Sequence, residues 1–285
     1  MSCRLEDSYT RLCVKGQFAF LASKSGVLRV QLPTFTTERV NTAEASALAV
    51  TAALDVANND GRVVEVWRGD RKLWAGLEHV REVTTLGWND HDSLLASGSA
   101  DSRVLIWDMR QQEPTFRLNT PAGAEVHAVS WCRDNTYYLA AAHDTAIKLW
   151  DVRLTMKSLA TVKKAHATRI ETMNWHPTNP SLLLTAGKLA TLRVWTNGHT
   201  KLTQLYHKEV RAVAVAKFTP YGDSLLYAPS QSEVKPTILS LSEDMRVLGQ
   251  LTGCRTHLLD FDFAQLEGVW YVIGLGGDHT LLQLP

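Results

Sequence analysis

The sequence predicts an all-β fold, a seven-bladed β-propeller of four-stranded antiparallel blades that fills residues 1–285 as a single domain. Three observations predict this fold class. A unit of about 40–45 residues recurs along the chain, as in propellers with one blade per repeat. Within each unit, apolar and polar residues alternate with the period of two that is typical of strands. Gly, Pro, Asn and Asp separate these short runs, and these residues favour turns between strands.

The repeat is plainest in the middle of the chain, at residues 83–108, 126–151 and 170–195. Each copy has an apolar strand that ends in Trp, a polar turn, a second apolar strand, another turn, and a third apolar strand that ends in Trp. In the first two copies Asp follows the last Trp, whereas Thr196 follows it in the third. Because three adjacent units share this order, we expect three adjacent blades of the same design.

Apolar or Trp residues at the ends of candidate third strands extend the repeat over the whole chain. Successive positions are 35 to 45 residues apart, so seven blades fill the sequence, with the first and last blades degenerate. A ring that leaves a free sheet edge invites aggregation, so a strand from one terminus should complete a blade begun at the other. We expect the first few residues to pair beside Leu281 to Leu284. The predicted third-strand ends are Leu32, Trp67, Trp107, Trp150, Trp195, Leu239 and Leu284.

Two blades are predicted to be irregular. Residues 41–50 are rich in Ala where the first strand of the second blade should stand, so this blade should be abridged. Residues 228–236 contain two prolines and predict a long loop in the sixth blade, which is a candidate binding loop. The Trp residues that end the first strands, Trp88, Trp131 and Trp175, should pack between blades rather than stack on nucleic-acid bases.

The Trp-Asp pairs at 107–108 and 150–151 resemble those of WD40 repeats. The resemblance implies that a buried hydrogen-bonded chain of Trp, Ser or Thr, His and Asp pins each blade. An unpaired polar group in the interior costs several kcal/mol, whereas a satisfied network makes the blade rigid. The matching residues in the third blade are His79, Ser97, Asp101 and Trp107.

The corresponding networks of the next two blades are predicted to be incomplete. The fourth blade has Ala140 in the Ser position and no His in the expected loop. The fifth blade has Leu189 in place of the Asp. The members that these blades retain are Asp144 and Trp150 in the fourth, and His166, Thr185 and Trp195 in the fifth.

The composition bounds the class of protein. There are 30 basic and 29 acidic residues, so no global field draws the chain to nucleic acid or to an anionic membrane. The four cysteines are scattered and form no C-x-x-C motif, which is typical of a reduced intracellular chain. The first residues are charged where a signal peptide is apolar, and no run of about 18 apolar residues occurs. We therefore expect a cytoplasmic protein, with the nucleus as the alternative, and no membrane insertion of its own.

Three clusters contain the residue types of active or ligand sites, and structural roles are favoured for all three. His79, Ser97 and Asp101 could form a catalytic triad, but they occupy the repeat positions of the blade network, and no nucleophile elbow surrounds Ser97. Residues 90–92, Asp-His-Asp, could bind a metal but lie in a repeated hairpin turn. Residues 274–279 resemble a phosphate-binding glycine run, yet a strand follows them instead of a helix. We predict no catalytic residue, metal or cofactor, and no enzyme.

A propeller without such a site presents loops and rims to partner proteins, so a non-catalytic interaction scaffold is the predicted function. Residues 91–95, 104–108, 147–151, 165–177 and 216–221 together resemble the N-terminal propeller of a WD40 subunit of the SEA/GATOR assembly. This resemblance implies a nutrient-sensing complex, recruited to the lysosomal or vacuolar membrane, that promotes amino-acid signalling to the target-of-rapamycin kinase complex. It implies other propeller subunits and RING-containing subunits as partners. Proteins of this family continue into RWD and RING-like regions, which lie outside this chain.

Two Trp-Asp-x-Arg boxes support an alternative function. Arg110 and Arg153 end boxes that resemble those by which some WD40 proteins dock on cullin-4 ubiquitin-ligase adaptors. The chain would then be a substrate receptor of such a ligase. The structural alternative is that both arginines only begin the outer strand, exposed and solvated. A third hypothesis is a histone or phosphopeptide reader that uses the central opening.

Overall fold

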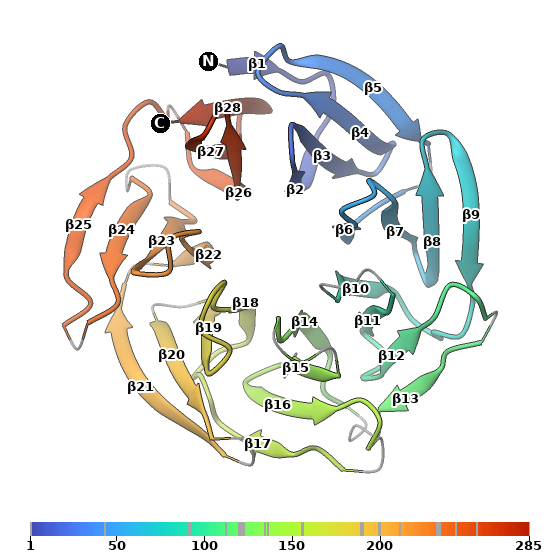
Figure 1. Ribbon diagram of the computed structural model, residues 1–285, viewed down its shortest axis with the longest axis vertical. Helices are drawn as coiled ribbons and strands as arrows, with labels where there is room; N and C mark the ends of the chain where they lie inside the picture. The colour runs from blue at the N-terminus through green and yellow to red at the C-terminus, as the bar shows by residue number, and fades with distance from the viewer. Residues whose placement is uncertain are drawn as a thin grey trace.

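The computed structural model is a closed ring of seven sheets around a central axis (Figure 1). It describes residues 2–42, 44–89, 93–111, 113–118, 123–133, 135, 137–154, 157–188, 191–198, 201–210, 212–231, 235–242, 244–254 and 256–284. Within these residues, 28 strands form seven four-stranded antiparallel sheets, which confirms the predicted fold class. No helix in the same residues is long and apolar enough to cross a membrane.

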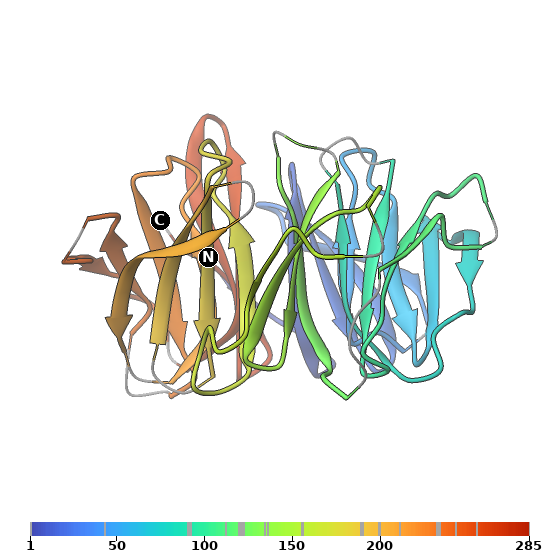
Figure 2. The same cartoon turned by 90° about the horizontal axis from the view of Figure 1, so that it is seen from below.

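The first strand of each blade lies next to the axis and the fourth lies at the rim (Figure 1). Seen from the side, the strands run through the thickness of the disc (Figure 2). Blade 1 contains β2 (Tyr9–Lys15), β3 (Phe18–Ser23), β4 (Gly26–Gln31) and β5 (Thr36–Asn41). Blade 2 contains β6 (Leu48–Val50), β7 (Val56–Asp60), β8 (Val63–Arg68) and β9 (Arg71–Gly76). Blade 3 contains β10 (Val83–Trp88), β11 (Leu95–Ser99), β12 (Val104–Trp107) and β13 (Phe116–Leu118).

The remaining blades follow the same order, and the seventh takes its outer strand from the N-terminal end of the chain. Blade 4 contains β14 (Val126–Trp131), β15 (Tyr138–His143), β16 (Ala146–Asp151) and β17 (Ala160–Val162). Blade 5 contains β18 (Ile170–Trp175), β19 (Leu182–Gly187), β20 (Thr191–Asn197) and β21 (Leu202–Glu209). Blade 6 contains β22 (Val213–Phe218), β23 (Ser224–Pro229), β24 (Thr237–Ser240) and β25 (Val247–Gln250). Blade 7 contains β26 (Leu258–Leu266), β27 (Val269–Gly276), β28 (Thr280–Leu284) and β1 (Ser2–Arg4).

The ring closes through β1, which pairs antiparallel with β28 so that Cys3 lies opposite Leu281. The pairing joins the two ends of the chain at one blade (Figure 1). It covers the edge of β28 with main-chain hydrogen bonds, as the sequence led us to expect.

Each predicted third-strand end lies in the third strand of its blade or directly after it, as Leu32 does after β4. The second blade is abridged, because its first strand β6 has three residues. The sixth blade differs from expectation. Ala228 and Pro229 belong to β23, where they lie opposite Val215 and Val213, and Ser230 and Gln231 lie beyond the strand. Proline fits there because the strand ends at this residue.

The apolar core consists of layers between blades. In the described residues, seven buried clusters each join the facing sides of two neighbouring blades, and one contains Trp131 from blade 4 with Leu94 from blade 3. The indole N–H of Trp131 donates to the Gly87 carbonyl at 2.8 Å, and that of Trp175 donates to the Ser130 carbonyl at 3.1 Å. These tryptophans therefore pack between blades.

Candidate functional site

The antiparallel order of every blade gives the disc two faces. We call the face at which the innermost strands begin the start face, and the face at which they end the end face. The second-to-third strand turns, including Asp101, lie on the start face. The third-to-fourth strand turns, including Arg110 and Arg153, lie on the end face with the last residues of the innermost strands.

Blade 3 brings its four predicted network residues together. The Nδ1 atom of His79 lies 2.9 Å from Oδ2 of Asp101, and its Nε2 atom lies 2.8 Å from Oγ of Ser97. The indole N–H of Trp107 donates to the same Ser97 oxygen at 2.8 Å. Burial opposes the charge on Asp101, but hydrogen bonds from His79 and from backbone amides lower its pKa to about 2. Ser97 and Trp107 are completely buried, so the Ser97 hydroxyl is held inside the blade.

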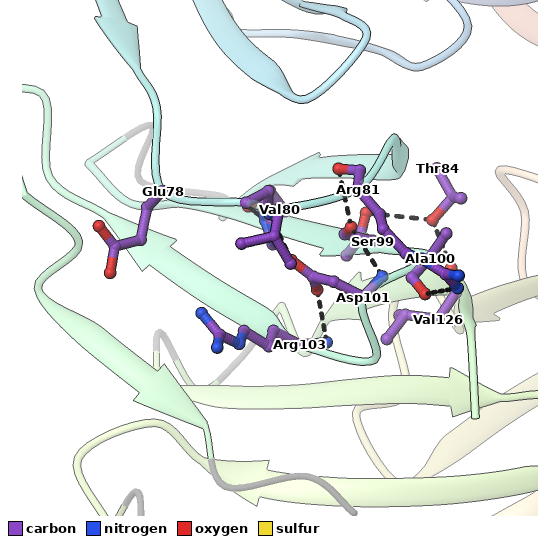
Figure 3. Close-up of polar contacts among 12 residues, drawn as sticks. Glu78, Val80, Arg81, Thr84, Ser99, Ala100, Asp101, Arg103 and Val126 are labelled. Carbon is purple, nitrogen blue, oxygen red and sulfur yellow. Dashed lines mark hydrogen bonds and ion pairs between the residues drawn. The ribbon is translucent and has the colours of Figure 1, made fainter. Parts of the chain in front are cut away.

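The same carboxylate fixes the loop that enters blade 3 (Figure 3). Asp101 accepts hydrogen bonds from the amides of Val80 at 3.0 Å and Arg103 at 2.9 Å. Ser99 extends the network, because its hydroxyl donates to the Arg81 carbonyl at 3.2 Å and accepts from the Asp101 amide at 3.0 Å. The loop therefore holds Val80, which is 62% exposed, in a fixed position on the start face.

Blade 5 completes its network with a residue that the sequence reasoning missed. His166 Nε2 lies 2.7 Å from the hydroxyl of Thr185, which accepts the indole N–H of Trp195 at 2.8 Å. His166 Nδ1 lies 2.7 Å from the hydroxyl of Thr191, which takes the place of the missing carboxylate. Burial, followed by the charge of Arg193, lowers the pKa of His166 to about 4. Leu189, predicted to replace the Asp, lies outside the described residues.

Blade 4 departs from the predicted network in two ways. Trp107 lies opposite Leu95 and Trp150 lies opposite Leu139, so the residue that corresponds to Ser97 is Ala141 and not Ala140. The prediction was wrong by one residue, and Ala140 faces the other side of the sheet. The indole N–H of Trp150 is buried and has no hydrogen-bond partner in the described part of the chain.

Asp144 is also misplaced in the sequence prediction. The turn between β15 and β16 is one residue shorter than that between β11 and β12, so Asp144 aligns with Ala100 rather than with Asp101. Its carboxylate pairs with Nε2 of His127 at 3.1 Å, and its side chain is 45% exposed. Asp144 therefore pairs with His127 at the surface of the start face and does not contact Trp150.

Both arginines of the Trp-Asp-x-Arg boxes bind the Asp of their own box. Nε of Arg110 donates to Asp108 at 2.8 Å, and Nε of Arg153 donates to Asp151 at 2.9 Å. These hydrogen bonds lower the pKa of both carboxyl groups. The side chains remain 85% exposed at Arg110 and 54% exposed at Arg153, whose guanidinium lies 4.4 Å from the ring centre of Tyr137. The Asp of each box thus orients a guanidinium that faces solvent.

Charged residues line the central channel at a cavity of about 240 Å³, to which all seven innermost strands contribute. Asp260 and Asp262 of β26 accept hydrogen bonds from the amides of Leu12 at 2.9 Å and Val14 at 2.8 Å, so two carboxylates tie blade 7 to blade 1. Lys217 Nζ lies 3.8 Å from Asp260 and 3.4 Å from Asp262. Burial disfavours the charge on Lys217, but these two carboxylates outweigh it and raise its pKa.

Buried asparagines hold blade 2, and the sequence reasoning missed them too. Asn59 accepts hydrogen bonds from the amides of Ala47 at 2.8 Å and Ser46 at 3.0 Å, and Asn41 donates to Asn58 at 3.1 Å. An Asn-Asn pair inside an otherwise apolar strand is the signal that could have predicted them. In the described residues, no three His, Cys, Asp or Glu side chains are placed to hold a metal. Residues 90–92 lie outside this part of the chain.

Comparison with known proteins gives the family. The model of the nucleolar protein 10-like N-terminal domain matches residues 30–187, which is more than half of the chain. The chain belongs to this family of propeller domains. A chain in the crystal structure of the mitotic checkpoint complex has the same fold, with a TM-score of 0.86 and 15% identity over 100% of this chain and 92% of that one.

Curated relatives share shorter stretches. The chain is 32% identical to the GATOR2 complex protein WDR59 of Gallus gallus over 124 residues, which are 42% of this chain and 12% of that protein. It is 29% identical to an RWD, RING finger and WD repeat-containing protein of Schizosaccharomyces pombe over 162 residues, 54% of this chain and 12% of that protein. The matches therefore span about an eighth of the length of these relatives.

Proposed function

We propose that this propeller is a non-catalytic interaction scaffold in a GATOR2-type assembly that promotes amino-acid signalling to the target-of-rapamycin kinase complex. The observation that carries the proposal is the similarity to the GATOR2 complex protein WDR59. Its partners are then other propeller subunits and RING-containing subunits. A rigid disc suits this role, since its loops contact partners without deforming the blades.

The assembly would act in the cytoplasm, recruited to the lysosomal or vacuolar membrane, with the nucleus as the alternative location. The resemblance to SEA/GATOR propellers supports this placement. The chain itself would reach the membrane through its partners. Imaging of the tagged chain during amino-acid starvation and refeeding tests this placement, and a uniform distribution that ignores nutrients would contradict it.

Affinity purification of the tagged chain, followed by mass spectrometry, tests the assembly. We expect other propeller and RING-containing subunits to be recovered with the wild-type chain. Replacing Arg110 and Arg153 by Glu should leave this recovery unchanged, because both side chains are largely exposed and the substitutions should leave the fold intact. Failure to recover any such subunit would refute the proposal.

The second candidate function is that of a substrate receptor of a cullin-4 ubiquitin ligase. The observation that favours it is the shared geometry of Arg110 and Arg153, two guanidinium groups oriented by carboxylates on the same face of adjacent blades. The guanidinium N–H groups that the Asp does not occupy can donate to acceptors of a partner. Recovery of a cullin adaptor with the wild-type chain, lost in the Arg110→Glu, Arg153→Glu variant and kept in Arg62→Glu, would establish it. Arg62 is exposed in the turn between β7 and β8, on the opposite face.

A further inference from the structure

The channel widens at the end face into a cavity of about 460 Å³, which we call the end-face mouth. The last residues of β2, β18 and β22 line it, together with the turns after β18 and β22, Arg133 after β14, and both inner strands of blade 7. Cavities of roughly 300–1,000 Å³ are the size at which proteins bind small molecules or side chains of partners. The mouth is therefore large enough for a bulky side chain.

Aromatic rings and cations share the wall of the end-face mouth. Trp175, Phe218, Phe263 and Trp270 line it, and the first two are only 6% and 5% exposed, so they form the sides of a pocket rather than a raised platform. At the rim, Tyr221 is 61% exposed and its ring meets that of Trp270 edge to face, with centres 6.2 Å apart. Such a wall favours an apolar or aromatic guest.

The charge of the wall is mainly positive. Lys15, Arg133 and Lys217 line the end-face mouth, against one carboxylate, that of Asp262. Lys217 is already paired with Asp262 and Asp260. The side chain of Lys15 forms no hydrogen bond or ion pair with any described residue, and Lys15 ends the strand that opens on the mouth. The positive charge of Lys15 therefore lies at the rim, above a floor in which Lys217 faces two carboxylates.

A second hollow continues from the end-face mouth across blades 3 and 4. It has a volume of about 200 Å³ and shares Arg133, Asn174 and Trp175 with the mouth. Its far side contains Trp88, whose buried indole N–H has no hydrogen-bond partner in the described residues. An extended chain that leaves the mouth in this direction would lie along this hollow.

We propose that the end-face mouth binds an extended acidic segment of a partner protein, with an aromatic side chain of that segment seated between Trp175, Phe218 and Trp270. A carboxylate that flanks the aromatic residue meets Lys15, and the following main chain runs past Arg133 toward Trp88. A single-stranded nucleic acid also combines stacking with positive charge. It fits less well, because its phosphates would approach Asp262 and the rings are recessed in a wall instead of displayed. The site belongs to the chain itself and does not depend on which assembly contains it.

Fluorescence anisotropy of the purified chain tests the proposal. The probes are short labelled peptides in which each common amino acid in turn stands between acidic flanks, together with the same peptides carrying Lys flanks. We expect binding only with acidic flanks and best with an aromatic centre. Charge-assisted contacts are strong enough that Lys15→Glu should weaken this binding about tenfold or more. The matched Lys24→Glu variant, in an exposed turn of the start face, should leave it unchanged.

A second variant fills the cavity and keeps every aromatic and charged residue of the wall. Thr178 is exposed at the mouth, so Thr178→Trp should block binding while the melting temperature stays that of the wild type. Three results would overturn the proposal. No acidic peptide binds, or Lys15→Glu and Lys24→Glu have equal effects, or a labelled oligouridylate binds more tightly than every peptide and loses affinity in Lys15→Glu.

Discussion

The hydrogen-bonded network of blade 3 allows a quantitative test, because one buried hydroxyl serves two partners. Ser97 Oγ lies 2.8 Å from both His79 Nε2 and Trp107 Nε1, and all three residues are buried. Ser97→Ala removes the hydroxyl and leaves both ring nitrogens without a partner. Each buried group left unsatisfied costs about 1–3 kcal/mol, so two such groups should lower the free energy of unfolding by about 2–6 kcal/mol. Domains typically have about 5–15 kcal/mol in total, so the loss is easily measured.

The reciprocal substitution is available in blade 4. Ala141 occupies the position of Ser97, and the indole N–H of Trp150 lacks a partner there. Ala141→Ser supplies a hydroxyl on the same face as Trp150, and a new hydrogen bond contributes about 0.5–1.5 kcal/mol of stability. The same Trp-to-Ser hydrogen bond can thus be removed from blade 3 and introduced into blade 4 of one protein.

Urea denaturation of the wild type and both variants measures these effects. We expect the midpoint to fall in Ser97→Ala and to rise in Ala141→Ser, with the slope of the free energy against urea unchanged. A Ser97→Ala variant within about 0.5 kcal/mol of the wild type, which is the spread of ordinary surface substitutions, would refute the claim that this network pins the blade.

Two further predictions concern pH and backbone conformation. Burial lowers the pKa of His143 and His166 to about 4, against 6.5 in an unfolded chain, so the unfolded state takes up protons first as the pH falls. The stability that both neutral histidines contribute is complete above pH 6.5, and it should fall toward pH 4 by up to about 1.4 kcal/mol per pH unit for each residue. His143→Leu should make the urea midpoint depend less steeply on pH across this range. An unchanged pH dependence would contradict the prediction. Gly26 has a φ of 125°, and a Cβ atom there would lie 2.1 Å from the carbonyl oxygen of Asn41. Gly26→Ala should therefore lower the melting temperature far more than Gly61→Ala, where a Cβ atom meets nothing within 4 Å; equal shifts would contradict the steric argument.

The blade boundaries could be predicted from the sequence because strand alternation and turn residues are local signals. Each repeat gives its strands in order, so even degenerate blades such as that ending at Leu32 were placed correctly. The network of blade 3 followed from the resemblance to WD40 repeats, whose pattern His79, Ser97, Asp101 and Trp107 match. Local order and spacing thus determine most of the fold.

The errors arose where the pairing register or chain closure decides the contact. A turn one residue shorter moves Asp144 away from the network position, and the sequence does not show which turn is short. Thr191 contacts His166 with a hydroxyl in place of a carboxylate, and no sequence motif marks this threonine. Asp260 and Asp262 bind amides 248 residues away, across a contact that exists only once the ring has closed. The end-face mouth depends on the same closure, since blades 7 and 1 both line it.

Blade 4 has the weakest internal network of the three central blades, yet it contributes Arg133, Tyr137 and Arg153 to the end face. Its neighbours supply the missing support. The indole N–H of Trp131 donates to the Gly87 carbonyl of blade 3, and the indole N–H of Trp175 in blade 5 donates to the Ser130 carbonyl of blade 4. Hydrogen bonds therefore hold blade 4 from both sides at the end face. Because these contacts lie next to the mouth, the arginines of blade 4 remain in position without a network of their own. The interaction surface that we propose is therefore fixed by packing between blades.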